Sequence, residues 1–113
     1  MVDENYHYGA IIKLNFTPQS GHEQAGWRPA IIISNDTYNE MNKNLRIVCP
    51  ITHTRQENPF WIPVEGCNAT DGFIIGNQPK TIDYKSRNAK WVEDAPQLAD
   101  EVRDLVRTFF EFE

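Results

Sequence analysis

The chain has 113 residues, which suits one domain spanning residues 1–113 and is too short for two. Hydrophobic residues make up 40 % of it, and no apolar stretch approaches the roughly 18 residues that a membrane-spanning helix needs. The net charge of −5 excludes a protein that coats nucleic acid through bulk positive charge. With an acidic N-terminus and no leader-like segment, a cytoplasmic location is expected.

The first half of the chain contains three predicted strands. Residues 8–16 form the first, because Ile12, Leu14 and Phe16 alternate with polar residues, and a loop rich in Pro, Gly and Ser follows over 17–26. The continuous apolar run in the second strand, 28–34, predicts burial on both faces. The third strand covers 45–51, with Pro50 at its end or on a sheet edge. Residues 35–44 form either a loop or one short helical turn.

The second half adds three short strands and a helix. The strands are expected over 60–64, 71–76 and 77–82, and such close spacing with little helix predicts a mainly β protein built as a small barrel. From Gln97 onward an apolar stripe marks an amphipathic helix that faces the core or a subunit interface, and Asp94 and Pro96 signal its start. The stripe consists of Leu98, Val102, Leu105, Val106, Phe109 and Phe112.

A polar, glycine-containing loop from Gly21 to Pro29 is the first candidate for an active-site wall. Within it, Glu23, His22 and Arg28 could serve as base, proton carrier and anion clamp in phosphate chemistry. Arg28 stays protonated, so it is a clamp and a poor base. The structural alternative pairs Arg28 with Glu23 or another acidic residue, and for His22 a solvated loop histidine is the favoured explanation.

A second candidate lies at the end of the third strand. There the hydroxyl of Thr52 could donate a hydrogen bond to a phosphate oxygen, although threonines are common at strand ends. The neighbouring His53 should point to the opposite face of the sheet, because side chains alternate along a strand. The cysteines, Cys49 and Cys67, and the three histidines show no ligand spacing, so we expect neither a metal nor a cofactor.

Four blocks, taken in order, resemble the MazF/PemK family of toxin ribonucleases. They are residues 9–18, 21–34 (Gly-His-Glu-Gln-Ala-Gly-Trp-Arg-Pro-Ala-Ile-Ile-Ile-Ser), 48–60 and 71–87. The chain departs from the family pattern at Ala10, where an acidic residue is usual, at Trp27, where some relatives carry histidine, and at Pro79, where valine is usual. Pro79 is expected to end strand pairing at its position.

The resemblance implies a small SH3-like (MazF/CcdB-type) barrel with a C-terminal helix, assembled as a homodimer. It also implies an mRNA interferase: an endoribonuclease that cleaves single-stranded RNA at short sequences without a metal ion, leaving a 2′,3′-cyclic phosphate and a 5′-hydroxyl. The implied partner is an antitoxin whose acidic segment blocks the RNA site, and the complex of the two could bind operator DNA. On this basis Arg28, Thr52 and Glu23 are the predicted catalytic residues, and the predicted RNA contacts are Phe16, Trp27, Asn35, Gln78 and Arg87.

Two other functions stay open from the sequence. One is a non-enzymatic toxin on the same fold, like the CcdB type, which binds a protein target such as DNA gyrase through its last residues, including a tryptophan. This chain ends Phe-Phe-Glu-Phe-Glu instead, and Arg28 and Thr52 favour the enzyme. The other is an inactive relative that only binds an antitoxin or operator DNA.

Overall fold

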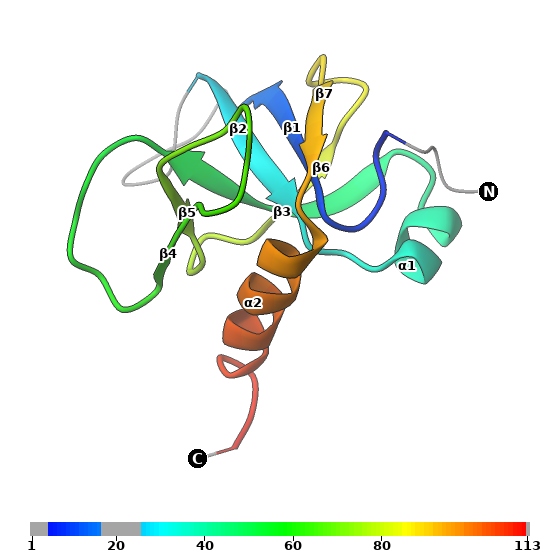
Figure 1. The fold of residues 1–113 in the computed structure, drawn as a ribbon. Coiled ribbons are helices and arrows are strands. Elements are labelled where there is room, and N and C mark those ends of the chain that lie inside the picture. The colour runs from blue at the N-terminus through cyan, green and yellow to red at the C-terminus, as the bar shows by residue number, and fades with distance from the viewer. Residues whose placement is uncertain (1–4, 17–25, 113) are drawn as a thin grey trace.

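A computed structural model describes residues 5–16 and 26–112, and these form a curled antiparallel sheet with two helices (Figure 1). The sheet has seven strands in the order β4-β5-β3-β2-β1-β7, and β6 pairs with β3. In chain order the elements are β1 (Ala10–Asn15), β2 (Trp27–Ile32), α1 (Asp36–Met41), β3 (Leu45–Thr52), β4 (Trp61–Pro63), β5 (Phe73–Ile75), β6 (Lys80–Asp83), β7 (Lys90–Asp94) and α2 (Pro96–Arg107).

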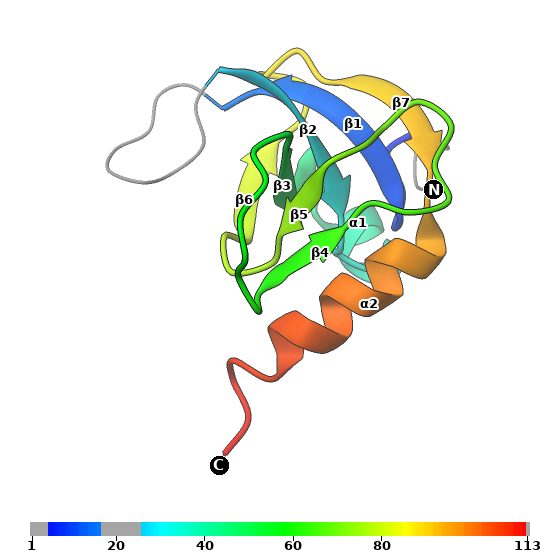
Figure 2. The same cartoon turned by 60° about the vertical axis from the view of Figure 1, so that its left-hand side comes forward.

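Apolar side chains gather on both faces of this sheet. In β2, Ala30 and Ile32 belong to one buried cluster and Ile31 to another, as the continuous apolar run predicts. The first cluster also holds Leu14 and Val48, inside the curl. The second lies between the other face of the sheet and α2, whose position along the sheet is visible in Figure 2. The mainly β fold with a C-terminal helix is therefore confirmed.

The position of Pro50 corrects a prediction. Pro50 lies inside β3 rather than at its end, opposite Ala30 of the neighbouring β2. Ile47 O accepts a hydrogen bond from Ile33 N, so the odd-numbered residues of β3 direct their backbone groups toward β2. Pro50, an even-numbered residue, directs its backbone toward the opposite edge of β3. On that edge, pairing with β6 ends at Val48 and pairing with β5 begins at Ile51. The missing N–H of proline is tolerated because β3 changes partner at this point.

Several boundaries also differ from the predictions. Residues 36–41 form the short helix α1, which settles the choice between loop and helical turn. β6 begins at Lys80 instead of Asn77, directly after Pro79, where pairing was expected to end. Strand β7 was not predicted; its sequence, Lys-Trp-Val-Glu-Asp, has no clear alternation, and the strand is defined by pairing with β1.

The C-terminal helix starts and ends slightly differently from the predicted pattern. Its N-cap is Ala95, which makes no side-chain capping bond. The Asp94 carboxylate does not cap the helix; it accepts a hydrogen bond from Trp91 Nε1 and lies 2.9 Å from His7 Nε2. Leu98 and Val102 are buried on the sheet and Leu105 and Val106 are half-buried, so this part of the stripe is a core contact. Phe109 and Phe112 lie beyond the end of the helix at Arg107. In the described part of the chain, neither helix is long and apolar enough to cross a membrane.

Candidate active site

Thr52 ends β3 with its side chain buried at 3 % exposure. Its Oγ1 accepts a hydrogen bond from the backbone N–H of Thr54, with 3.2 Å between the two atoms. A hydroxyl that accepts one bond keeps its own proton to donate. Thr52 is therefore held in place with a donor available for a further acceptor.

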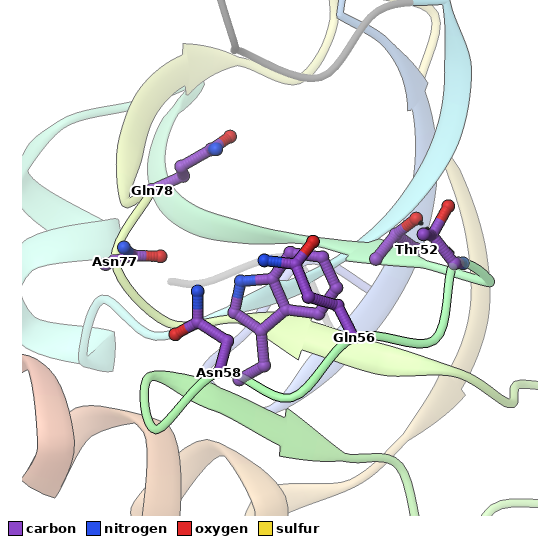
Figure 3. A pocket seen from close by; sticks show the side chains of 7 residues that line it. Thr52, Gln56, Asn58, Asn77 and Gln78 are labelled. Atoms are coloured by element: carbon purple, nitrogen blue, oxygen red, sulfur yellow. Dashed lines mark hydrogen bonds between the residues drawn. The ribbon is translucent and has the colours of Figure 1, made fainter.

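The Thr52 side chain lines a pocket of about 370 Å³. The described residues around it carry two hydroxyls, four amides and one indole, and none is charged: Thr52, Thr54, Gln56, Asn58, Trp61, Asn77 and Gln78. Figure 3 shows Thr52 at one side of the pocket and Asn77 and Gln78 at the other, with Gln56 and Asn58 between them. Amides offer both donors and acceptors, which suits a ligand with a mixed hydrogen-bonding edge, such as a nucleobase.

One of these amides has a fixed orientation. Asn58 Oδ1 accepts a hydrogen bond from the backbone N–H of Phe60 over 2.9 Å, as in a turn closed by an Asx side chain. The oxygen is thereby engaged within the loop, and the NH₂ group of Asn58 is left to donate. This favours a ligand that presents an acceptor at that point of the pocket.

Arg28 lies on the strand next to Thr52. The pairs Ile32 with Val48 and Ala30 with Pro50 define the register of β2 and β3, and continuing it by two residues brings Arg28 opposite Thr52. Side chains of opposed residues lie on the same face of a sheet. Arg28 is half-buried and pairs with Leu14 of β1 on its other edge. The register thus brings the two predicted anion-binding residues to one end of one face.

The predicted RNA contacts fall into two groups. Gln78 lines the pocket with Thr52, while Trp27 and Arg87 lie at the strand ends nearby: Trp27 begins β2 at 49 % exposure, and Arg87 Nη1 donates to Asn15 O over 3.0 Å. Phe16 is at this end too, but its ring is fully buried in the first cluster, so it presents no face on which a base could stack.

Asn35 is not brought to the pocket. It follows β2 at the end opposite to Arg28, about 20 Å away along an extended strand. Its Oδ1 accepts from Tyr38 N over 2.8 Å, so its observed role is to cap α1. The candidate base Glu23 and the candidate proton carrier His22 lie outside the described residues.

His53 faces away from Thr52, as predicted. It borders a separate cleft of about 140 Å³, together with Lys13 and Asp71, and its Nε2 lies 2.8 Å from Asp71 Oδ1. Neighbouring residues at the end of one strand therefore serve opposite sides of the sheet.

Sequence reasoning missed five pocket residues: Thr54, Gln56, Asn58, Trp61 and Asn77. The polar stretch 52–59 was a visible signal that a loop follows β3. No signal in the sequence indicates the direction that this loop takes, because the path of a loop depends on the positions of the strands that it connects. The return of this loop toward Asn77 and Gln78 exists only in the folded sheet.

Comparisons with known proteins agree with this architecture. Residues 7–110 match the family described as PemK-like, MazF-like toxins of type II toxin–antitoxin systems. The chain is 37 % identical over 82 residues to the endoribonuclease toxin MazF of Escherichia coli (strain K12), covering 72 % of this chain and 71 % of that protein.

Two solved structures from Deinococcus radiodurans show the same fold. The first, MazF (Form-I), has a TM-score of 0.85 at 32 % identity and covers 96 % of this chain and 98 % of its own. The second, a MazE–MazF structure (Form-II), has a TM-score of 0.80 at 31 % identity and covers 98 % of this chain and 100 % of the matched chain.

Proposed function

Because this chain belongs to the PemK-like, MazF-like family of toxins of type II toxin–antitoxin systems, we propose that it is an endoribonuclease that cleaves single-stranded RNA at a short sequence without a metal ion. A relative that is 37 % identical is named an endoribonuclease toxin, which supports RNA cleavage. The observation that carries the proposal is the placement of Arg28 and Thr52 on one face, with Thr52 lining an uncharged pocket rich in amides.

The proposed reaction is an internal transesterification. The ribose 2′-oxygen attacks the adjacent phosphorus, forming a 2′-O–P bond, and the bond from phosphorus to the 5′-oxygen breaks. A base takes the proton of the 2′-hydroxyl, and an acid supplies one to the departing 5′-oxygen, so the products are a 2′,3′-cyclic phosphate and a 5′-hydroxyl. Glu23 is the proposed base; Arg28 stays charged and donates hydrogen bonds to the departing 5′-oxygen, which takes its proton from water.

Charge stabilisation is the main task of the described residues. The phosphate gains negative charge as the new bond forms, and donors already aimed at it stabilise that charge. Arg28 supplies a permanently charged fork of N–H groups, and Thr52 supplies the hydroxyl proton that its bond from Thr54 leaves available.

The pocket beside Thr52 is the proposed site for a base next to the cleaved bond. Its volume of about 370 Å³ lies at the lower end of ordinary ligand pockets. Trp61 offers an aromatic wall, and Gln78 and the oriented amide of Asn58 offer hydrogen bonds to a base edge. Reading a base in this way gives cleavage its sequence preference.

The proposed partners follow from the same family membership. The MazE–MazF structure pairs a similar chain with a second protein, and an antitoxin with an acidic segment would compete with RNA for Arg28. A homodimer is supported by an apolar groove of about 300 Å³ beside α2, lined by Ile33, Ile47, Pro79, Val106 and Phe110 among others. Binding to operator DNA would occur through the toxin–antitoxin complex.

The test is incubation of the purified, antitoxin-free protein with a long single-stranded RNA in excess EDTA, followed by mapping of cut sites and end groups. Cuts at one short motif that leave cyclic phosphates, and that disappear in Arg28→Ala, are expected. Lys43→Asn is the control, because it removes one exposed positive charge at a position where φ is +53°, which asparagine tolerates.

Two results would contradict the proposal. If Arg28→Ala unfolds the protein, Arg28 is structural and the site is misplaced. If the folded wild-type protein cuts no RNA in a set that covers all short motifs, a toxin that binds a protein target such as DNA gyrase, or an inactive relative, explains the chain better.

A further inference from the structure

The turn between β6 and β7 is basic in a protein of net charge −5. From residue 80 to 90 there are four cations, Lys80, Lys85, Arg87 and Lys90, and one acidic residue, Asp83. Asp83 Oδ1 accepts hydrogen bonds from the backbone N–H groups of Lys85 and Ser86, over 3.0 and 3.1 Å. The carboxylate therefore shapes the turn, while Lys85 and Lys90 are exposed.

This basic turn is continuous with the end of the molecule that carries Arg28. Asn15 N donates to Arg87 O over 3.2 Å, and Arg87 Nη1 returns a bond to Asn15 O, so the turn is tied to the end of β1. Lys80 Nζ lies 5.9 Å from the centre of the Phe16 ring. Figure 1 shows the turn beside the end of β1. Cations thus lead from the candidate active site toward the turn.

A cleft of about 270 Å³ lies at the turn. Its described lining holds two lysines and no carboxylate: Tyr6, Tyr84, Lys85, Asn88, Ala89 and Lys90. The tyrosine rings stack with 4.1 Å between centroids, and Tyr6 Oη donates to Ala89 O over 3.0 Å. The aromatic wall is therefore fixed in position before any ligand arrives.

A further cation, the buried Arg46, lies next to the cleft. The Arg46 guanidinium lies over the Tyr84 ring, 4.9 Å from its centre. Lys13, which pairs with Lys90 across β1 and β7, lines the separate cleft beside His53 and Asp71 and is not part of this surface.

We propose that the β6–β7 turn and its cleft form a second RNA-binding surface, which holds a nucleotide of the substrate strand outside the cleaved sequence. The inference rests on the proposed ribonuclease function. Surfaces that bind single-stranded RNA combine cations for the phosphates with aromatic and amide groups for the bases, and this cleft supplies Lys85 and Lys90, the half-buried ring of Tyr6 and the amide of Asn88. RNA is the occupant that we propose, because the turn is tied through Arg87 to the end of β1 beside Arg28, where the substrate strand would pass.

The test measures RNA binding in the Arg28→Ala background, which prevents cleavage. Fluorescently labelled RNAs of about 6 and about 20 nucleotides, both centred on the mapped cleavage motif, are titrated at several salt concentrations. Lys85→Gln/Lys90→Gln is expected to weaken binding of the longer RNA about tenfold and to reduce its salt dependence by one to two released ions, roughly one per lysine. Binding of the short RNA should not change, and Lys43→Asn should affect neither RNA.

The outcomes separate this inference from the proposed function. If the wild-type protein cleaves the short RNA but the double variant binds the longer RNA as its parent does, the inference fails and the function stands. If the double variant instead loses affinity only for an acidic antitoxin peptide, the surface binds protein and the inference also fails. The cleavage assay tests the proposed function separately from the titration: a wild-type protein that cleaves neither RNA refutes that function.

Discussion

Thr54 donates its backbone N–H to the side-chain Oγ1 of Thr52, two residues earlier, over 3.2 Å. The bond occupies a lone pair of the hydroxyl and leaves its proton for a phosphate oxygen. Thr52→Val, which keeps the shape and removes the donor, should lower kcat about 100-fold. Thr52→Ser should retain activity within a few fold. Single-turnover cleavage of one RNA by both variants checks this, and unchanged kcat in Thr52→Val would remove Thr52 from the site.

Replacing His53 should leave cleavage intact. His53 adjoins Thr52 in sequence but lies on the other side of the sheet, where Nε2 contacts Asp71. His53→Ala is therefore expected to show wild-type kcat and the wild-type dependence of kcat on pH. A pH–rate profile that loses one limb in this variant would show that His53 takes part in proton transfer.

Gly72 should tolerate substitution much less well than Gly66. Both have positive φ, +109° and +75°, so alanine is strained at either position. A Cβ on Gly72 would lie 2.3 Å from Thr52 O, whereas a Cβ on Gly66 meets no atom within 4 Å. We expect Gly66→Ala to cost about 1 kcal/mol of unfolding free energy and Gly72→Ala about 3 kcal/mol. Urea denaturation measures both, and equal losses would show that the close approach to Thr52 is relieved at no cost.

Arg46 should contribute strongly to stability. Its side chain is 1 % exposed and donates hydrogen bonds to the carbonyl oxygens of Tyr6, Asn39, Lys43 and Leu45. Arg46→Ala leaves these acceptors without their donor and opens a cavity, so the unfolding free energy should fall by about 3–5 kcal/mol.

Two further variants test the reason for that loss. Arg46→Lys should fall between wild type and alanine, since lysine keeps the charge but not the fork of donors. Arg107→Ala, at an exposed position, should change stability little. A small loss in Arg46→Ala would mean that water replaces the missing donors.

Glu93 should make folding stability depend on pH in the acidic range. Burial alone would raise its pKa, but hydrogen bonds from Asn68 N–H, the Thr70 hydroxyl and Ala69 N–H outweigh burial and hold the pKa below its ordinary value of 4.5. A carboxylate with a lowered folded-state pKa stabilises the fold above its unfolded-state pKa, and this stabilisation is lost as the pH falls through the folded-state pKa.

The corresponding variant is Glu93→Gln, which should be less stable than wild type at pH 7. The difference between the two proteins should shrink as the pH falls below about 4.5, the unfolded-state reference. Urea midpoints measured from pH 7 to pH 3 provide the comparison. A constant difference over that range would show that the carboxylate charge plays no part in holding residues 68–70.

The amino-acid sequence by itself determined most of the strands and the C-terminal helix. Alternating residues such as Ile12 and Leu14, and the helical spacing of Leu98 and Val102, record which side of each element is buried. The buried side of an element can be read from its own residues, so this prediction does not require knowledge of the elements that pack against it. The order of the four sequence blocks also pointed to the correct family.

Tertiary structure alone decided which residues meet. β7 exists because residues 90–94 pair with β1, about 80 positions earlier in the chain, and their own sequence has little strand pattern. Pairing of β5 with β3 and β4 brings Asn58 and Asn77 into one pocket with Thr52, whereas Asn35, three residues after β2, caps α1. Contacts between distant segments depend on the register of the paired strands and on the path of the loops. Residue type and local spacing specify neither of these.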